Sequence, residues 1–303
     1  MYGKSLVENF QKIRLSIPDG RGGCKSVEFS TDEDSDEDRR APAPVYKQKR
    51  VRVMELKDFF KENSRVALAF SGGTDSAFLM YAAKAAGADV HAYYVKTAFQ
   101  PQVEYDEAVS LAREMDCPLT ILTADVLADE RIRSNPSNRC YYCKKAIFSK
   151  IAFAAAADGY DIIIDGTNAS DSYDDRPGMK ALEEQKVLSP LRICGITKAE
   201  LRSLSKEAGV RTWDKPSYSC LATRVKAGLE ITKECLEKIE AAETALDRIG
   251  FRDYRVRTDG VDARLELTSK DMHLALEHRA EIIGELKKNF GVIAMGLEAR
   301  DDE

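Results

Sequence analysis

The sequence predicts an α/β fold with a doubly wound, mostly parallel sheet and a smaller C-terminal α+β domain. From about residue 51, short apolar runs alternate with helical patterns, and a glycine-rich turn follows the first apolar run. After about residue 213 the alternation gives way to a long amphipathic helix and paired strands. Strand–helix alternation favours a parallel sheet whose ligands bind at the carboxyl ends of its strands.

The α/β part is expected over residues 51–212. The continuous apolar run VALAF (66–70) predicts a buried strand, and residues 75–86 predict a helix that Gly87 ends. Further strands are expected at 90–95, 119–124 and 161–165, and further helices at 103–115, 143–157 and 197–209. The last helix begins at Thr197, which forms a capping-box pattern with Glu200.

The C-terminal domain is expected over residues 213–303. Residues 232–249 predict a long amphipathic helix, because apolar residues recur on one face at helical spacing. Strands are then expected at 253–257 and 262–267, a helix from Thr268 to about residue 290, and a last strand at 292–297.

Residues 1–50 form an acidic extension. Residues 31–40 contain six acidic residues, and APAP follows them. Such a segment buries too little apolar surface to offset the entropy lost on ordering, so the extension is predicted to be disordered. A short helix is compatible with residues 5–13.

Composition excludes several classes of protein. Hydrophobic residues make up 44% of the 303 residues, and the longest apolar run, 151–157, is too short to cross a bilayer. The first fifteen residues lack the apolar block of a signal peptide, so a cytoplasmic location is expected. Residues 51–303 carry 36 basic and 42 acidic residues, which argues against nucleic acid as a partner. Seven cysteines without an export signal favour free thiols, metal ligation or catalysis over disulfides.

The turn after the first strand is the strongest candidate site. The string SGGTDS offers backbone N–H groups at a helix N-terminus and hydroxyl donors, which favour phosphate, and an acid that could hold Mg²⁺. The candidate residues are Ser71, Gly72, Gly73, Thr74, Asp75 and Ser76. No lysine stands where a Walker A loop requires one. A plain strand–turn–helix junction would also tolerate the two glycines.

A second strand end points to the same edge of the sheet. The string DGTN follows the strand predicted at 161–165 and places Gly166, Thr167 and Asn168 near the glycine-rich turn. These residues are candidates for the same ligand. The alternative is an ordinary turn whose polar side chains bond one another.

Three cysteines form a candidate metal site. Cys140 and Cys143 form a Cys-x-x-Cys pair, and Cys220 lies in a loop that could return to the strand ends. Three thiolates without a fourth protein ligand suit a [4Fe–4S] cluster with one open iron, whereas structural zinc prefers a fourth ligand. A redox dithiol also remains open.

The C-terminal domain carries a candidate anion-binding surface. Glu243 interrupts an apolar helical stripe, where a carboxylate must be paired or face a polar cavity. Arg255 and Arg257 alternate in one predicted strand, and Arg264 and Glu266 alternate in the next. These groups could bind a phosphorylated, carboxylated ligand. A structural ion-pair network between helix and sheet is the alternative.

Taken together, the motifs resemble the LarE family of ATP-dependent sulfur transferases, which help to build the nickel-pincer nucleotide cofactor of lactate racemase. The resemblance covers residues 55–300 and includes SGGTDSAF, NPSNRCYYCK, DDRPG and WDKPSYSCLATR. The first motif is shared by the whole PP-loop ATP-pyrophosphatase superfamily, whereas DDRPG combined with KPSYSCLATR is more restrictive. The acidic extension and the C-terminal GVIAMGLEARDDE depart from the family pattern.

The resemblance implies a reaction and its cofactors. ATP with Mg²⁺ would adenylate a carboxylate of a pyridinium dicarboxylate mononucleotide, and sulfur would displace AMP to leave a thiocarboxylate. In single-cysteine members the sulfur comes from the cysteine that matches Cys220, which becomes dehydroalanine. This sequence matches the members in which three cysteines hold a [4Fe–4S] cluster with an extra sulfide.

The resemblance also implies binding residues and partners. It places Arg224, Glu243, Arg255 and Arg257 in the substrate pocket, and it implies a small-molecule nucleotide substrate, a sulfide donor and a homo-oligomer.

Three other functions share some of these features. A tRNA thiolation enzyme joins the same loop to a three-cysteine cluster, but it would need a basic RNA-binding surface. An amidotransferase-type ligase such as NAD synthetase shares the loop and does not need the cysteines. A non-enzymatic protein with structural zinc and a degenerate loop is the third.

Overall fold

The structure is a computed structural model, and it describes residues 14–18, 24–28, 55–171 and 177–300. Contacts divide the chain into two compact units, residues 1–50 and 51–303. None of the described helices combines the length and the apolar character that crossing a membrane requires.

The first unit contains a short antiparallel sheet that the sequence analysis did not predict. Strand β1 (Arg14–Pro18) pairs with β2 (Cys24–Glu28), and five residues rich in glycine, DGRGG, separate them. A glycine-rich connection of this length is typical of a hairpin. The acidic stretch 31–40 and the helix expected at 5–13 lie outside the described residues, so the predicted disorder stays a prediction.

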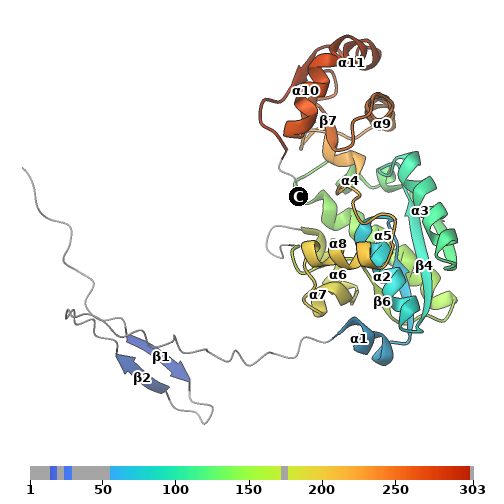
Figure 1. The fold of residues 1–303 in the computed structure, drawn as a ribbon, viewed down its shortest axis with the longest axis vertical. Helices are drawn as coiled ribbons and strands as arrows, with labels where there is room; N and C mark the ends of the chain where they lie inside the picture. The colour runs from blue at the N-terminus through green and yellow to red at the C-terminus, as the bar shows by residue number, and fades with distance from the viewer. Residues whose placement is uncertain (1–13, 19–23, 29–54, 172–176, 301–303) are drawn as a thin grey trace, which may run out of the picture. The chain divides into compact units, whose positions relative to one another are not determined.

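The second unit contains the predicted parallel sheet (Figure 1). Its strands lie in the order β5-β4-β3-β6, and every neighbouring pair is parallel. They are β3 (Arg65–Ala69), β4 (Asp89–Lys96), β5 (Leu119–Thr123) and β6 (Ile163–Ile164). The α/β fold is therefore confirmed, although β6 is shorter than the strand expected at 161–165.

Helices cover both faces of this sheet, which makes it doubly wound. Alternate residues of a strand point to opposite faces. Leu68 and Tyr94 pack with one set of helices, whereas Ala67 and Tyr93 pack with the other. The first set is α1 (Leu56–Glu62), α2 (Thr74–Ala85), α3 (Gln102–Glu114) and α8 (Lys198–Glu207); α5 (Arg139–Ala157) covers the second face.

The C-terminal part is a three-stranded sheet with helices. Strands β7 (Tyr254–Thr258) and β8 (Ala263–Leu267) are antiparallel, and β9 (Ile293–Met295) lies parallel to β8. Helix α9 (Lys233–Ile249) matches the helix expected at 232–249, and Thr232 is its N-cap.

One expected C-terminal helix is in fact two. Instead of a single helix from Thr268 to about residue 290, the structure has α10 (Ser269–Glu277) and α11 (Arg279–Leu286) (Figure 1). His278, between them, has backbone angles outside the helical region. The break lets both helices pack on the core, because Ala275 of α10 and Ile282 of α11 are both buried there.

A single hydrophobic cluster joins the parallel sheet to the C-terminal part. It runs from Tyr93 of β4 to Leu246 of α9 and Val256 of β7. The predicted division into domains at residue 213 marks the change from parallel to mixed sheet and stays a prediction. Shorter elements are η1 (Val126–Ala128), α4 (Glu130–Arg133), α6 (Pro177–Glu184), α7 (Pro190–Ile193) and η2 (Leu221–Arg224).

Candidate active site

The glycine-rich turn connects β3 to α2, as the sequence predicted. Gly72 has a φ of +76°, and a Cβ added there would lie 2.8 Å from the Cβ of Ala108 in α3. Both the left-handed backbone and the close approach require glycine. Gly73 is the N-cap of α2, so the free N–H groups of the first turn of the helix face the loop. This is the geometry that binds an anion at a helix N-terminus.

The hydroxyl groups of the turn bond the turn itself. The Ser71 hydroxyl lies 3.1 Å from the Ser76 hydroxyl, which also donates to the carbonyl of Gly73. Thr74 Oγ1 donates to the carbonyl of Thr212 at 2.6 Å, which ties the turn to the segment after α8. The turn is therefore held in shape before any ligand binds.

The structure brings the DGTN segment against this turn. A Cβ on Gly166 would lie 2.9 Å from the backbone nitrogen of Ser76, so only glycine lets the two segments approach so closely. Asp165 accepts hydrogen bonds from the Thr167 hydroxyl at 2.5 Å and the Ser189 hydroxyl at 2.6 Å. The polar side chains of this segment thus partly bond one another, as the alternative interpretation expected.

Asp75 is the acid at the centre of this arrangement. Its Oδ1 accepts a hydrogen bond from Asn168 at 2.9 Å, and its Oδ2 pairs with Lys198 at 2.5 Å. Carboxylate oxygens are ligands that Mg²⁺ prefers, so the residue present fits the expected ion in its chemistry. The sequence analysis did not predict a role for Lys198, at the start of α8, because in the sequence it is only the first residue after a helix cap.

Cys140 and Cys143 both lie on α5, which corrects the sequence prediction. The helix was expected to begin at residue 143, but it begins at Arg139. The two cysteines are therefore three residues apart on one helix, a spacing that puts side chains on the same face. Cys140 is exposed, and Cys143 is half-buried against the core.

Cys220 precedes the short helix η2 and returns the chain to the sheet. The next residue, Leu221, donates its N–H to the carbonyl of Phe99, in the loop after β4. Strand β4 is the parallel neighbour of β3, whose carboxyl end carries the glycine-rich turn. Cys220 and the turn thus both lie at the carboxyl-end edge of the sheet.

The three thiols lie within electrostatic reach of one another. Burial, together with the proximity of Cys220 and Cys140, raises the pKa of Cys143 to about 12. Burial also raises the pKa of Cys220, although the nearby Arg139 guanidinium offsets part of the increase. Within the described residues, no group of three or more His, Cys, Asp or Glu side chains is arranged to hold a metal ion. Three neighbouring thiols beside a cation fit a cluster in their donor chemistry, and the cluster stays a prediction.

Asn135 and Arg139 clamp the cysteine helix to the segment after Cys220. Asn135, in the left-handed region at φ +54°, donates to the carbonyls of Val225 and Lys226. Arg139 donates to the carbonyl of Ala222 at 3.0 Å and to the Asn135 side chain. Both clamp residues are buried. No sequence pattern predicts this role for the two residues, because their backbone partners lie about 90 residues further along the chain.

Arg224 and Glu243 form a buried ion pair. Arg224 Nε donates to Glu243 Oε1 at 2.7 Å, and the two residues are 0% and 4% exposed. Glu243 also accepts hydrogen bonds from the Tyr218 hydroxyl and from the backbone nitrogen of Val256. The pair therefore joins η2, α9 and β7, as expected if these charges form a structural ion-pair network. Contact with a substrate stays a prediction for both residues.

Arg255 and Arg257 occupy different environments. Arg255 is buried and donates to the carbonyls of Tyr254 and Ser217. Burial, together with the cations Arg224 and Arg300, lowers its pKa to about 10. Arg257 is partly exposed, and it donates to the carbonyl of Thr223 and to Glu266 at 2.9 Å.

Arg257 lines a cavity of about 770 Å³ between the start of α5, the segment after Cys220, and strands β7 and β8. Two of its lining residues contact the cysteine-bearing segments: Arg139 contacts the sulfur of Cys140, and the Thr223 hydroxyl donates to the backbone carbonyl of Cys220. The charged residues of its lining are Arg139, Arg224, Lys226, Arg257, Arg264, Asp259, Asp262 and Glu266. Five cations thus face three acids in a chain whose net charge is negative.

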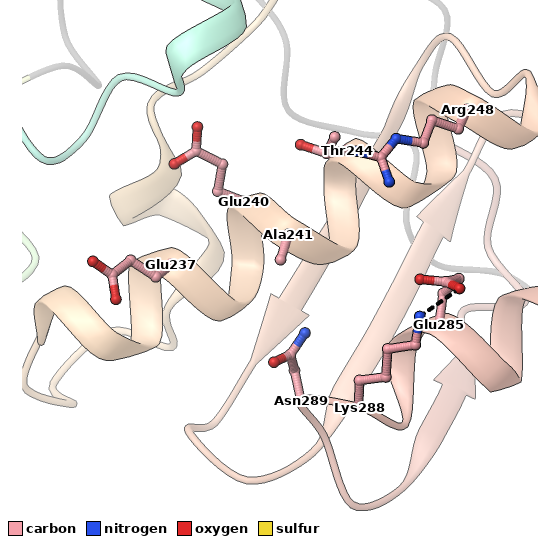
Figure 2. Close-up of a pocket in the computed structure, with 8 residues that line it drawn as sticks. All are labelled: Glu237, Glu240, Ala241, Thr244, Arg248, Glu285, Lys288 and Asn289. Carbon is pink, nitrogen blue, oxygen red and sulfur yellow. Dashed lines mark hydrogen bonds and ion pairs between the residues drawn. The ribbon is translucent and has the colours of Figure 1, made fainter.

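A second, smaller depression of about 370 Å³ lies between α9 and the end of α11 (Figure 2). It holds an ion pair between Glu285 and Lys288 and contains none of the predicted site residues. Its charged side chains are those of an ordinary helical surface.

Comparison with known proteins identifies the family. The chain is 34% identical to the pyridinium-3,5-bisthiocarboxylic acid mononucleotide synthase of Lactiplantibacillus plantarum over 209 residues, which cover 68% of this chain and 76% of that one. The chain belongs to the family of this synthase. No family model matches it.

Other relatives include two uncharacterised proteins and a tRNA-specific 2-thiouridylase. An uncharacterised protein of Synechocystis is 34% identical over 82% of this chain and 93% of its own length. An uncharacterised protein of Methanocaldococcus jannaschii is 30% identical over 82% and 96%. The tRNA-specific 2-thiouridylase of Pseudothermotoga lettingae is 26% identical over 50% and 54%, a weaker match than the other three.

Proposed function

We propose that the protein is an ATP-dependent sulfur transferase that converts carboxylates of a pyridinium dicarboxylate mononucleotide into thiocarboxylates, in the biosynthesis of the nickel-pincer nucleotide. The observation that supports the proposal is that Cys220 and the glycine-rich turn lie at the same edge of the parallel sheet, with Cys140 and Cys143 within electrostatic reach of Cys220. Membership in the synthase family supports the choice of substrate.

The turn between β3 and α2 would bind ATP. Backbone N–H groups at the start of α2, together with the hydroxyls of Ser71, Thr74 and Ser76, would hold the phosphates, and Gly166, Thr167 and Asn168 would close the opposite side. A substrate carboxylate oxygen attacks the α-phosphorus, the bond to the β-phosphate oxygen breaks, and pyrophosphate leaves. Mg²⁺ held by Asp75 would offset the charge of the leaving group.

Lys198 is an additional cation at this point of the turn. Its ammonium lies 2.5 Å from Asp75 Oδ2. With Mg²⁺ held at Asp75, the Lys198 ammonium would donate to the departing pyrophosphate and so stabilise charge as it develops.

The second step needs an anionic sulfur. The three thiolates of Cys140, Cys143 and Cys220 would hold a [4Fe–4S] cluster, which when bound supplies an exchangeable sulfide to the adenylated carboxyl. Sulfur forms the new bond to the acyl carbon, and AMP leaves with the electron pair of the broken C–O bond. A sulfide donor would restore the sulfur after each turnover. In this proposal the enzyme works as a cytoplasmic homo-oligomer.

The arginines would hold the substrate. Arg257 lines the open cavity and would contact the substrate directly. Arg224, Glu243 and Arg255 are buried and bonded to one another or to backbone carbonyls, so they would support the shape of the pocket.

The test is a reaction under anaerobic conditions. The protein is incubated with ATP, Mg²⁺, sulfide and pyridinium-3,5-dicarboxylic acid mononucleotide, and thiocarboxylate, AMP and the mass of the protein are measured. The proposal expects thiocarboxylate and AMP in equal amounts, with iron and acid-labile sulfide in the protein and an unchanged protein mass. A protein mass lower by about 34 Da, one H₂S, would instead indicate that Cys220 itself gave up its sulfur. Absence of thiocarboxylate would contradict the proposal.

A further inference from the structure

The first part of the string KPSYSC, which lies between α8 and η2, has no role in the site as described so far. We infer that its lysine, Lys215, is a positioning residue: by pairing with Glu104 and Glu107 of α3, it sets where Cys220 lies relative to the glycine-rich turn. The inference rests on the proposed function, and it adds a residue that controls the second step without touching the ligand.

Lys215 is held by two carboxylates. Its ammonium lies 2.9 Å from Glu104 Oε1 and 2.5 Å from Glu107 Oε2. The side chains of Lys215 and Glu104 are only 18% and 15% exposed, so salt screens this pair less than a surface pair. Burial lowers the pKa of Lys215, but the two carboxylates raise it by more, so the ammonium stays charged. An ammonium that already faces two carboxylates anchors its segment to α3.

Helix α3 supports the glycine-rich turn on the same face. Ala108 of α3 is the residue that a Cβ on Gly72 would approach within 2.8 Å. Glu104 and Ala108 are four residues apart on this helix, a spacing that places side chains next to each other on one face. One face of α3 therefore contacts both the turn and the lysine anchor, and it fixes the distance between them.

The segment 215–220, all of which the structure describes, forms neither helix nor strand, so side-chain contacts determine its position. The carbonyl of Ser217 accepts a hydrogen bond from an arginine of β7, and the Tyr218 hydroxyl donates to a carboxylate of α9 at 2.7 Å. Both contacts go to the C-terminal part. Without Lys215 the segment would follow that part, and Cys220 would lose its fixed place relative to the turn.

Backbone groups on either side of the segment join it to the region of the turn. Before the segment, the carbonyl of Thr212 accepts from Thr74 of the turn at 2.6 Å. After it, the N–H of Leu221 donates at 2.9 Å to the carbonyl of Phe99, in the loop that leads into α3. Lys215 supplies the charged contact between these two points. Its loss should therefore loosen the segment while the turn keeps its own contacts.

The test separates the two steps of the reaction. Pyrophosphate and thiocarboxylate are followed in a single turnover of the full-length protein, with the anaerobic mixture given above, for the wild type, Lys215→Met and Lys215→Arg. Lys215→Met should form pyrophosphate at the wild-type rate but thiocarboxylate about tenfold more slowly, the effect of one lost charge-assisted hydrogen bond. Lys215→Arg should recover most of the second rate, because the charge is kept.

Lys206→Met is the matched control. The ammonium of Lys206 lies 4.5 Å from the ring centre of Trp213, just before the segment, and within the described part of the chain it pairs with no acid. The control should form both products at wild-type rates. The inference is wrong if Lys215→Met forms thiocarboxylate at the wild-type rate, or if both products slow in the same proportion, as a partial loss of folded protein would cause.

The position of Cys220 is also tested without turnover. Iodoacetamide should alkylate Cys220 about tenfold faster in Lys215→Met, while the buried Cys117 and Cys194 should react as in the wild type. An unchanged rate at Cys220, or equal acceleration at all three cysteines, would contradict the inference. Faster alkylation of Cys220 alone, in a protein whose wild type forms no thiocarboxylate, would support the placement by Lys215 and refute the proposed function.

Discussion

The glycine-rich turn and the thiol-containing region differ in how the chain builds them. The turn is six consecutive residues, 71–76, which follow β3 and run into the first turn of α2, and its shape follows from two glycines and a helix N-terminus. The thiol-containing region combines α5, the segment around Cys220 and the β7–β8 pair, and the last two lie about 80 and 115 residues after the start of α5. A contiguous site depends on local backbone conformation, whereas a composite site depends on packing and can be lost through a residue that touches no substrate.

The largest effect is expected from a substitution that removes sulfur transfer and leaves ATP binding intact. Cys220→Ala should abolish thiocarboxylate formation, because the variant lacks one of the three thiols, while the affinity for ATP should stay unchanged. Cys235→Ala, a cysteine at the start of α9, is the control and should keep full activity. Product formation and ATP binding are measured separately. A Cys220→Ala variant that no longer binds ATP would show that the two regions are not independent.

The reciprocal variant, Gly72→Ala, should damage only the turn. The new Cβ would lie 2.8 Å from Ala108 at a positive φ, at a cost of roughly 1–3 kcal/mol, so ATP should bind about tenfold more weakly or worse. Iron and sulfide content should not change. Gly87→Ala distinguishes the effect of the positive φ from that of the contact with Ala108, because Gly87 also has a positive φ but a Cβ added there would meet nothing within 4 Å. Equal loss of ATP binding in both variants would mean that the contact with Ala108 is unimportant.

Lys198→Met tests the cation that only the structure revealed. Without the ammonium, pyrophosphate release should slow about tenfold, the loss expected for one charge-assisted hydrogen bond. Lys198→Arg should restore part of the rate, because the charge is kept. The rate of AMP and pyrophosphate formation is the measurement. Wild-type rates in Lys198→Met would exclude a role in adenylation.

The clamp residue Asn135 tests how packing assembles the thiols. Asn135→Ala removes the donors to Val225 and Lys226, so it should lower the free energy of unfolding by about 1–3 kcal/mol. It should also reduce cross-linking of Cys220 to Cys143 or Cys140 by dibromobimane. Asn138→Ala is the control, because Asn138 is exposed at the start of α5 and its side chain makes no capping bond. Unchanged cross-linking in Asn135→Ala would contradict the clamp.

The smallest effect is expected outside both regions. Removal of residues 1–45 should leave kcat/KM for thiocarboxylate formation within about twofold, because the predicted site residues all lie in the second unit. The measurement is steady-state kinetics of the shortened and full-length proteins. A large loss would give the acidic extension a role in catalysis.

Most elements of the fold were predictable because their signals are local. The apolar run VALAF became β3, the glycine-rich turn led into α2, and Thr197 and Glu200 formed the predicted capping box. Where the sequence analysis was wrong, packing decided the outcome. Helix α5 begins at Arg139, which binds Ala222, and the last long helix breaks at His278 so that both halves reach the core.

The sequence alone determined which chemical groups this protein has: a glycine-rich turn before a helix, three cysteines and an arginine-rich strand pair. Their conformational preferences act over a few residues, so they can be recognised in one dimension. Only the tertiary structure decided which groups meet. It buried Arg224 against Glu243, left Arg257 open to a cavity, and placed Lys198 on Asp75, because each of these contacts joins segments that only the packed core holds together.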